Sequence, residues 1–158
     1  RPPPDRLIVP ESLLELFMTE TNISEALSDS LVSSSRTALG DTLRTVVYFT
    51  PDAFDVLYTR SDLYGGDPER VREVKSRFVN SERVGFDAQE TYRDLAGVPD
   101  AEPDIGEYEF TIRVFSDGFV SRVIVGDHGV LLTTDSMDIN SFEELAVSLR
   151  KILADKSA

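Results

Sequence analysis

The chain has 158 residues, of which 41% are hydrophobic, which is enough for one buried core and too few for two comfortable domains. It has no cysteine, which excludes disulfides, thiolate metal sites and a cysteine nucleophile. The 29 acidic and 16 basic residues leave a net charge of −13, and only three of the basic residues are lysine. This acidic, lysine-poor composition predicts adaptation to concentrated salt, because salt screens the repulsion between like charges.

The same features exclude several classes of protein. No apolar run approaches the roughly 18 residues of a membrane-spanning helix, and the first residues lead into no signal-peptide core. Together with the missing cysteine, this predicts a cytoplasmic protein without a membrane partner. Proteins bind duplex nucleic acid through clustered positive charge, so the net negative charge of this chain disfavours nucleic acid as a partner.

The N-terminal residues differ in composition from the rest. Residues 1–4 are one arginine and three prolines, and residues 11–17 read Glu-Ser-Leu-Leu-Glu-Leu-Phe. Position 1 is not methionine, whereas Met18 would serve as a natural start. We therefore expect residues 1–21 to be an N-terminal extension, flexible or not native, and residues 22–155 to form a single α+β domain.

A first helix and a first strand are predicted next. Asn22 and Glu25 have the spacing of a capping box, and Gly40 ends the helix. One face of this helix carries Ile23, Leu27 and Leu31. The run of β-branched and aromatic residues at 45–49 is typical of a buried strand.

Residues 52–60 fit two structures. Pro51 and Asp52 could begin a helix with Phe54, Leu57 and Tyr58 on one side. They could equally turn the chain into a strand in which Phe54, Val56 and Tyr58 alternate on one face. We favour the strand, because the turn would then close a hairpin.

Two helical segments follow Gly65-Gly66. Asp67 is the expected N-cap, Pro68 occupies the first helical position, and the apolar stripe is Val71, Val74 and Phe78. A second segment follows Gly85, with Asp87 and Glu90 as a capping box and with Ala88, Tyr92 and Leu95 on one face. Residues 96–106, rich in proline, glycine and acids, predict an exposed loop.

The C-terminal third predicts an antiparallel meander and a helix. Residues 107–115 alternate, which indicates a strand whose core-facing side chains are Tyr108, Phe110, Ile112 and Val114. A hairpin turn at 116–118 leads to strands at 119–125 and 130–134. Ser141 and Glu144 then form a capping box that opens the last helix.

From residue 22 the predicted order is α-β-β-α-β-β-β-α, which resembles that of the profilin-like group with its roadblock and longin domains. The resemblance implies a five-stranded antiparallel sheet with packed helices. At residue level the chain resembles an uncharacterised family of small haloarchaeal proteins, a domain of unknown function, in the runs Thr45-Val46-Val47-Tyr48-Phe49, Leu57-Tyr58, Arg60-Ser61-Asp62-Leu63, Glu107-Tyr108, Ile112-Arg113 and Phe142-Glu143-Glu144. That second resemblance agrees with adaptation to salt and implies no activity.

No residue pattern indicates catalysis. His128, the only histidine, lies in a predicted turn at 126–129 without a nucleophile beside it in sequence. Acidic pairs such as Asp52 with Asp55 arise by chance among 29 acids, and no phosphate-loop Lys-Ser/Thr pair follows Gly65-Gly66. The sequence therefore predicts no enzyme, no cofactor and no metal site.

Basic residues gather on the helix that starts at Asp67. A solvated face neutralised by pairs such as Glu73 with Arg77 is the simpler interpretation. The functional interpretation is a docking face for an acidic protein partner, formed by Arg70, Arg72 and Arg77.

We therefore predict a non-catalytic protein-interaction or dimerisation module, whose partner is an unidentified protein or a second copy of the chain. The alternative is a small-molecule sensor of the PAS or profilin-like type, with a pocket between sheet and helix lined by Tyr48, Tyr58 and Phe110. An enclosed apolar cavity would favour the sensor. A filled core with an exposed apolar patch would favour the module.

Overall fold

The computed structural model describes residues 19–96 and 106–155. The predicted loop at 96–106 and the extension at 1–21 therefore lie largely outside the described residues. The elements are α2 (Glu25–Leu39), β1 (Leu43–Phe49), β2 (Phe54–Thr59), α3 (Pro68–Glu82), α4 (Val84–Ala96), β3 (Thr111–Phe115), β4 (Gly118–Val125), β5 (His128–Thr134) and α5 (Ile139–Ala154). This confirms the α+β class and the predicted order, with α3 and α4 following one another in the place of the central helix.

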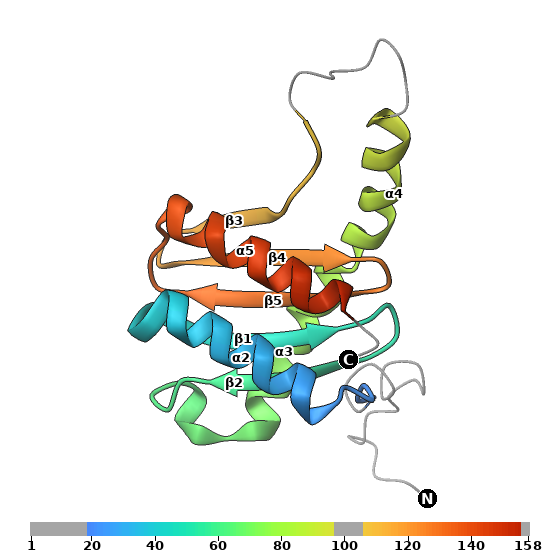
Figure 1. The fold of residues 1–158 in the computed structure, drawn as a ribbon. Helices are drawn as coiled ribbons and strands as arrows, with labels where there is room; N and C mark the ends of the chain where they lie inside the picture. Colours follow the sequence, from blue (N-terminus) through green and yellow to red (C-terminus); the bar gives the residue numbers. More distant parts are fainter. Residues whose placement is uncertain (1–18, 97–105, 156–158) are drawn as a thin grey trace, which may run out of the picture.

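The five strands form one antiparallel sheet in the order β2-β1-β5-β4-β3. Helices α2 and α5 lie side by side on one face, and α3 crosses the other (Figure 1). The central strand β5 is buried along its whole length because helices cover both of its faces. The edges of the sheet are β2 and β3.

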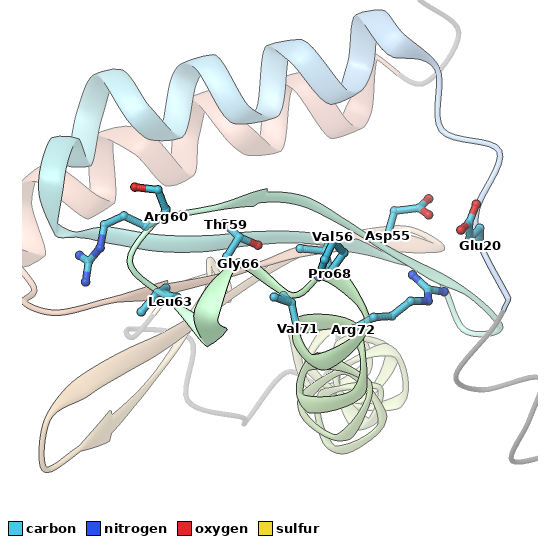
Figure 2. A pocket seen from close by; sticks show the side chains of 11 residues that line it. Glu20, Asp55, Val56, Thr59, Arg60, Leu63, Gly66, Pro68, Val71 and Arg72 are labelled. Atoms are coloured by element: carbon cyan, nitrogen blue, oxygen red, sulfur yellow. The ribbon is translucent and has the colours of Figure 1, made fainter.

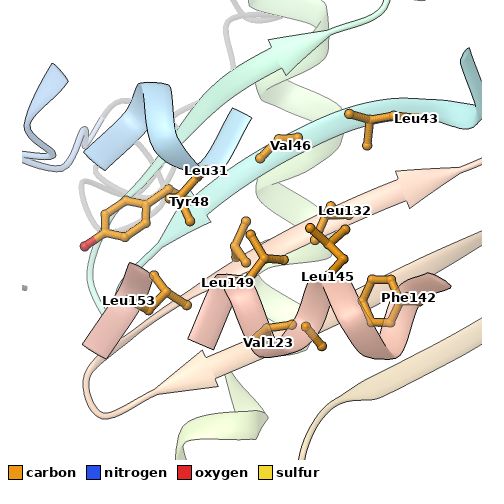
Figure 3. Close-up of a cluster of buried hydrophobic side chains, with 12 residues drawn as sticks. Leu31, Leu43, Val46, Tyr48, Val123, Leu132, Phe142, Leu145, Leu149 and Leu153 are labelled. Atoms are coloured by element: carbon orange, nitrogen blue, oxygen red, sulfur yellow. The ribbon is translucent and has the colours of Figure 1, made fainter. Parts of the chain in front are cut away.

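Apolar side chains fill the space on both faces. The larger cluster lies between the sheet and the pair α2 and α5 (Figure 3), and its members are Leu31, Leu43, Val46, Tyr48, Val123, Val130, Leu132, Phe142, Leu145, Ala146, Leu149 and Leu153. The smaller cluster lies between the sheet and α3 and contains Val47, Phe49, Phe54, Val79, Val120, Ile124 and Leu131. Of the residues described, 19–96 and 106–155, none belongs to a helix long and apolar enough to cross a membrane.

None of the three predicted capping boxes lies at the observed start of its helix. Ser24, and not the predicted Asn22, caps α2 by accepting a hydrogen bond from the Leu27 amide. Asp138, three residues before the predicted Ser141, caps α5. Helix α4 begins at Val84, so that Asp87 lies within its first turn. The predicted cap Asp67 and the stop at Gly40 are confirmed.

Strand β2 confirms the preferred interpretation of residues 52–60, but the predicted alternation is wrong. Val46 pairs with Tyr58 and Val47 with Val56, so Leu57 is an extra residue in a β-bulge. The bulge turns Tyr58 toward the α2 side, whereas Phe54 and Val56 pack on the α3 side. Sequence periodicity cannot show a bulge, because the bulge is a property of strand pairing.

Strand β3 is shorter than predicted and starts at Thr111. Phe110 and Ile112 do pack against the larger cluster, as expected. Val114 is 74% exposed, and Tyr108 stacks on Tyr92 of α4, so the core-facing assignment is wrong for both. The physical reason is that β3 is an edge strand with a neighbouring strand on one side only.

Candidate interaction surface

The β3 edge of the sheet is open. Strand β3 pairs with β4 alone, so among residues 19–96 and 106–155 no strand covers its outer side. An uncovered edge presents unpaired backbone N–H and C=O groups, which favour pairing with another strand. Two large apolar side chains lie at the end of this strand, Val114 and the half-exposed Phe115, whose ring meets Phe78 of α3 edge-on at a centroid distance of 6.3 Å.

Helix α4 carries an apolar stripe that the rest of the described chain leaves exposed. Val84, Ala88, Tyr92 and Leu95 follow at helical spacing, and Val84 and Leu95 are 55% and 50% exposed. The helix runs away from the sheet beyond β3 (Figure 1). The stacked pair of Tyr92 and Tyr108, with ring centroids 4.7 Å apart, joins the outer half of α4 to the segment that leads into β3.

A buried ion network fixes the start of α4 against the same edge. Glu82, at the end of α3, is buried and accepts hydrogen bonds from Arg113 of β3 and from Arg122 of β4, the latter at 3.0 Å between Nη1 and Oε2. The hydrogen bond to Glu82 raises the pKa of Arg113 above its usual value. Arg122 also donates to Thr111 at 3.0 Å. Glu82 therefore links α3 to both strands at this side of the sheet.

Gly85 allows the close approach of α4 to the ion network. A Cβ at this position would lie 2.6 Å from Arg122 Cζ, which is closer than atoms can pack. A larger residue at 85 would require the side chains of Arg122 and Ile124, or α4 itself, to move. The position of the exposed stripe therefore depends on Gly85 and on the burial of Arg122. We call the β3 edge with Val114 and Phe115, together with the α4 stripe, the β3-edge surface.

A groove opens at the opposite edge of the sheet, between β2 and the start of α3 (Figure 2). Its volume is about 390 Å³, and its floor is formed by Val56, Leu63 and Val71. The carboxylates of Glu20 and Asp55 lie at one end (Figure 2). Its size falls within the usual range of small-ligand sites, but it is not the pocket expected from the sequence.

The three predicted pocket residues all belong to the core around α2 and α5. Tyr48 is buried, and its hydroxyl bonds to His128 Nδ1 at 2.7 Å. Tyr58 packs beneath the Arg36 guanidinium, and Phe110 meets Phe142 edge-on at 4.9 Å. None of the three lines the groove beside β2. Their role in a ligand pocket stays a prediction.

His128 lies outside the turn in which the sequence predicts it, because it is the first residue of β5 and is buried. Its Nε2 bonds to the Leu153 carbonyl at 2.7 Å, so this nitrogen carries the proton, and Nδ1 accepts from Tyr48. Burial, followed by the charges of Asp127 and Asp55, raises the pKa of Tyr48. The pair joins β1, β5 and the end of α5, and it has a structural role.

The three arginines of the predicted docking face are not equivalent. Arg70 and Arg77 are exposed on the outer side of α3. The guanidinium of Arg72 instead lies 3.9 Å from the centre of the Phe54 ring and donates to the Thr19 carbonyl at 2.6 Å. Packing therefore already uses Arg72, and docking through Arg70 and Arg77 stays a prediction.

Sequence reasoning found the α4 stripe from Ala88 onward but assigned Val114 to the core, and it missed Val84 and the supporting residues Glu82 and Arg122. Val84 lies four residues before Ala88, so extending the predicted stripe by one turn would have included it. Glu82 and Arg122 carry no such signal, because charged residues are usually exposed and their burial depends on each other. Within residues 19–96 and 106–155, no cluster of three or more histidine, cysteine or carboxylate residues could hold a metal ion.

The strand order and the helices packed on the sheet give this protein the profilin-like α+β fold of the roadblock type, with an open edge at β3. The chain belongs to the family described as Domain of unknown function (DUF7522), which it matches over residues 29–154. No protein of curated function matches it in sequence. The uncharacterised-family resemblance is thus confirmed, while the haloarchaeal origin stays a prediction.

Solved structures of MglB have a similar fold. An MglB described in a tetrameric arrangement has a TM-score of 0.50 at 14% identity, covering 84% of this chain and 94% of that one. The gliding protein MglB of Thermus thermophilus has a TM-score of 0.48 at 12% identity, with 84% and 95% covered. Myxococcus xanthus MglB has a TM-score of 0.44 at 10% identity, with 83% and 97% covered. At these identities the likeness concerns the fold alone.

Proposed function

We propose that the chain is a non-catalytic interaction module that forms a homodimer through the β3-edge surface. The observation that carries this proposal is the coincidence of an unpaired edge strand with an exposed apolar stripe on α4. The two core clusters, by contrast, are filled with side chains. A filled core with an uncovered apolar surface favours association with another protein over an internal ligand.

A second copy is the partner that this surface fits. When two β3 strands pair antiparallel about a twofold axis, each copy supplies the backbone groups that the other lacks. The same axis brings the α4 stripe of each copy toward the partner's edge. The tetrameric arrangement described for one MglB is an example of this fold associating with copies of itself.

The net charge makes this association depend on salt. Two copies that each carry −13 repel one another over the whole surface. At 1 M salt the Debye length falls to about 3 Å, so the apolar contact and strand pairing then act with little opposition. We therefore expect the dimer to be stronger in 2 M KCl than in 0.1 M KCl.

Light scattering coupled to size-exclusion chromatography tests the proposal. In 2 M KCl the wild-type chain should elute with twice the chain mass of 17.6 kDa. Val114→Lys, which places a charge on the open edge, should elute as a monomer with an unchanged circular dichroism spectrum. Val147→Lys is the matched control, because Val147 is 49% exposed on α5, away from β3.

Three results would contradict a homodimer formed through the β3-edge surface. The first is a monomeric wild type at millimolar concentration in 2 M KCl. The second is equal disruption by Val114→Lys and Val147→Lys, which would mean that the lysine acts through charge alone and not through the edge. The third is a dimer that persists in Val114→Lys, which would place the interface elsewhere.

The groove beside β2 favours small-molecule binding as a second candidate function. Val56 and Val71 form part of its apolar floor, and at one end the two carboxylates of Glu20 and Asp55 outnumber the guanidinium of Arg72, which leaves that end with a net negative charge. These features suit a ligand with an apolar body and a cationic group. Val56→Trp should fill the groove, so a ligand that raises the unfolding temperature of the wild type should have no effect on this variant.

A further inference from the structure

Lys75 is a buried amine. It lies on the inner face of α3, four residues after Val71 and four before Val79, and is only 3% exposed. Within residues 19–96 and 106–155 its side chain forms no ion pair. Its nitrogen instead lies 5.5 Å from the centre of the Tyr64 ring and 5.2 Å from that of Phe78. Burial of a charged ammonium between two rings is costly, because the rings replace only part of its hydration.

The turn that holds Tyr64 over this amine is strained. Tyr64, Gly65 and Gly66 have φ angles of 54°, 61° and 75°, so three successive residues adopt the left-handed conformation. Tyrosine rarely adopts it, whereas glycine does so at little cost. No atom lies within 4 Å of a Cβ built on either glycine, so the outer side of the turn is open. We call Tyr64–Gly66 the Tyr64 flap.

The surroundings favour the neutral form of the amine. Burial, followed by the positive charge of Arg44 on β1, lowers the pKa of Lys75 to about 8. At pH 7 the neutral fraction is then roughly 10%, about 300 times that of an ordinary lysine. Only the neutral amine is a nucleophile, so this lysine differs chemically from an exposed one.

We propose that Lys75 is an acylation site that becomes accessible when the Tyr64 flap opens. The Nζ lone pair attacks the carbonyl carbon of a small acyl donor, either a thioester or a mixed anhydride. An amide bond forms, the bond to the thiolate or carboxylate leaving group breaks, and the nitrogen releases one proton to solvent. The neutral amide removes the buried charge.

Trace acetylation of the intact chain by acetic anhydride tests this site without a variant. The chain has three lysines, so peptide mass spectrometry assigns each product, and the exposed Lys151 of α5 is the internal reference. At pH 7 we expect Lys75 to be acetylated in the folded chain although it is buried, because its larger neutral fraction offsets the small fraction of time for which the flap is open. The rate at Lys75 should level off above about pH 8, because its amine is then mostly neutral. A Lys75 that stays unmodified in the folded chain, or whose rate still rises steeply above pH 9, overturns the proposal.

A matched pair of glycine variants tests the flap. Gly65→Val and Gly126→Val both place a β-branched residue at a position of positive φ with open space around it, but Gly126 lies in the turn between β4 and β5. Gly65→Val should open the flap and accelerate acetylation of Lys75, while Gly126→Val should leave it unchanged. Equal acceleration in both variants would show that labelling follows unfolding of the whole domain. No acceleration in Gly65→Val would show that the flap does not control access. Either result overturns the proposal.

Discussion

Replacing Lys75 by methionine should stabilise the protein. Methionine has a similar length, carries no charge, and makes favourable contacts with aromatic rings such as Tyr64 and Phe78, which flank the lysine nitrogen. The pKa of Lys75 falls from 10.5 to about 8 in the folded chain. Each tenfold loss of proton affinity corresponds to about 1.4 kcal/mol, so the buried charge costs about 3 kcal/mol of folding free energy at pH 7. Lys75→Met should recover much of this.

The pH dependence follows from the same shift. Because the folded pKa lies below the unfolded one, the unfolded chain binds more protons between pH 8 and 10.5, and the stability of the wild type rises with pH across this window. Lys75→Met lacks this rise, so its advantage should be greatest below pH 8 and should shrink toward pH 10. The raised pKa of Tyr48 acts in the opposite direction above pH 10, but it is common to both chains and cancels in the difference.

Urea unfolding at pH 7, 8, 9 and 9.5 in constant salt measures the difference. Lys151→Met is the matched control, because Lys151 is exposed on α5 and its removal should change stability by less than about 1 kcal/mol at every pH. The reasoning is refuted if Lys75→Met is less stable than the wild type at pH 7. It is refuted equally if the difference between the two chains does not depend on pH.

Four further predictions concern other parts of the fold. Glu82→Leu should destabilise the protein by about 3–5 kcal/mol in urea unfolding, because it leaves the buried Arg122 without its ion-pair partner. Arg113→Ala should cost under about 1 kcal/mol, because Arg113 lies at the half-exposed end of the network. Phe110→Ala should cost about 2–4 kcal/mol through its lost contact with Phe142, and Val114→Ala should cost almost nothing; equal costs would contradict the face assignment. The thermal midpoint should rise substantially between 0.1 M and 2 M KCl, and a constant midpoint would exclude stabilisation by charge screening. Arg72→Ala should lower stability by about 1 kcal/mol because Arg72 packs on Phe54, while Arg70→Glu with Arg77→Glu should leave stability unchanged and reduce recovery of an acidic partner if that face docks one.

Local patterns predicted most of the elements correctly. The alternation of residues 111–115 and the β-branched run at 45–49 do form strands, and Asp67 with Pro68 does begin a helix. These signals are local, because a strand or a helix start depends on side-chain spacing and on one capping contact. The start of α2 was predicted two residues too early, because Ser24 supplies the capping oxygen in place of Asn22.

The candidate surface was less predictable, since exposure depends on what covers a residue. Val114 and Phe110 have the same parity in the same alternating run, yet one is exposed and the other packs on Phe142. The sequence cannot show that β3 lies at the edge of the sheet, because strand order is decided by pairing between distant segments. The same limit applies to the β-bulge at Leu57, which moved Tyr58 to the opposite face.

The sequence by itself determined the acidic surface, the lack of cysteine chemistry, and the order of helices and strands, because composition and periodicity are properties of the chain alone. Only the tertiary structure decided which charges are buried. Lys75, Glu82 and Arg122 are ordinary charged residues in the sequence, and they become unusual because α3 places them against the sheet. A charge changes its energy when water is removed from it, and the removal of water is decided by the packing of segments that are far apart in the chain.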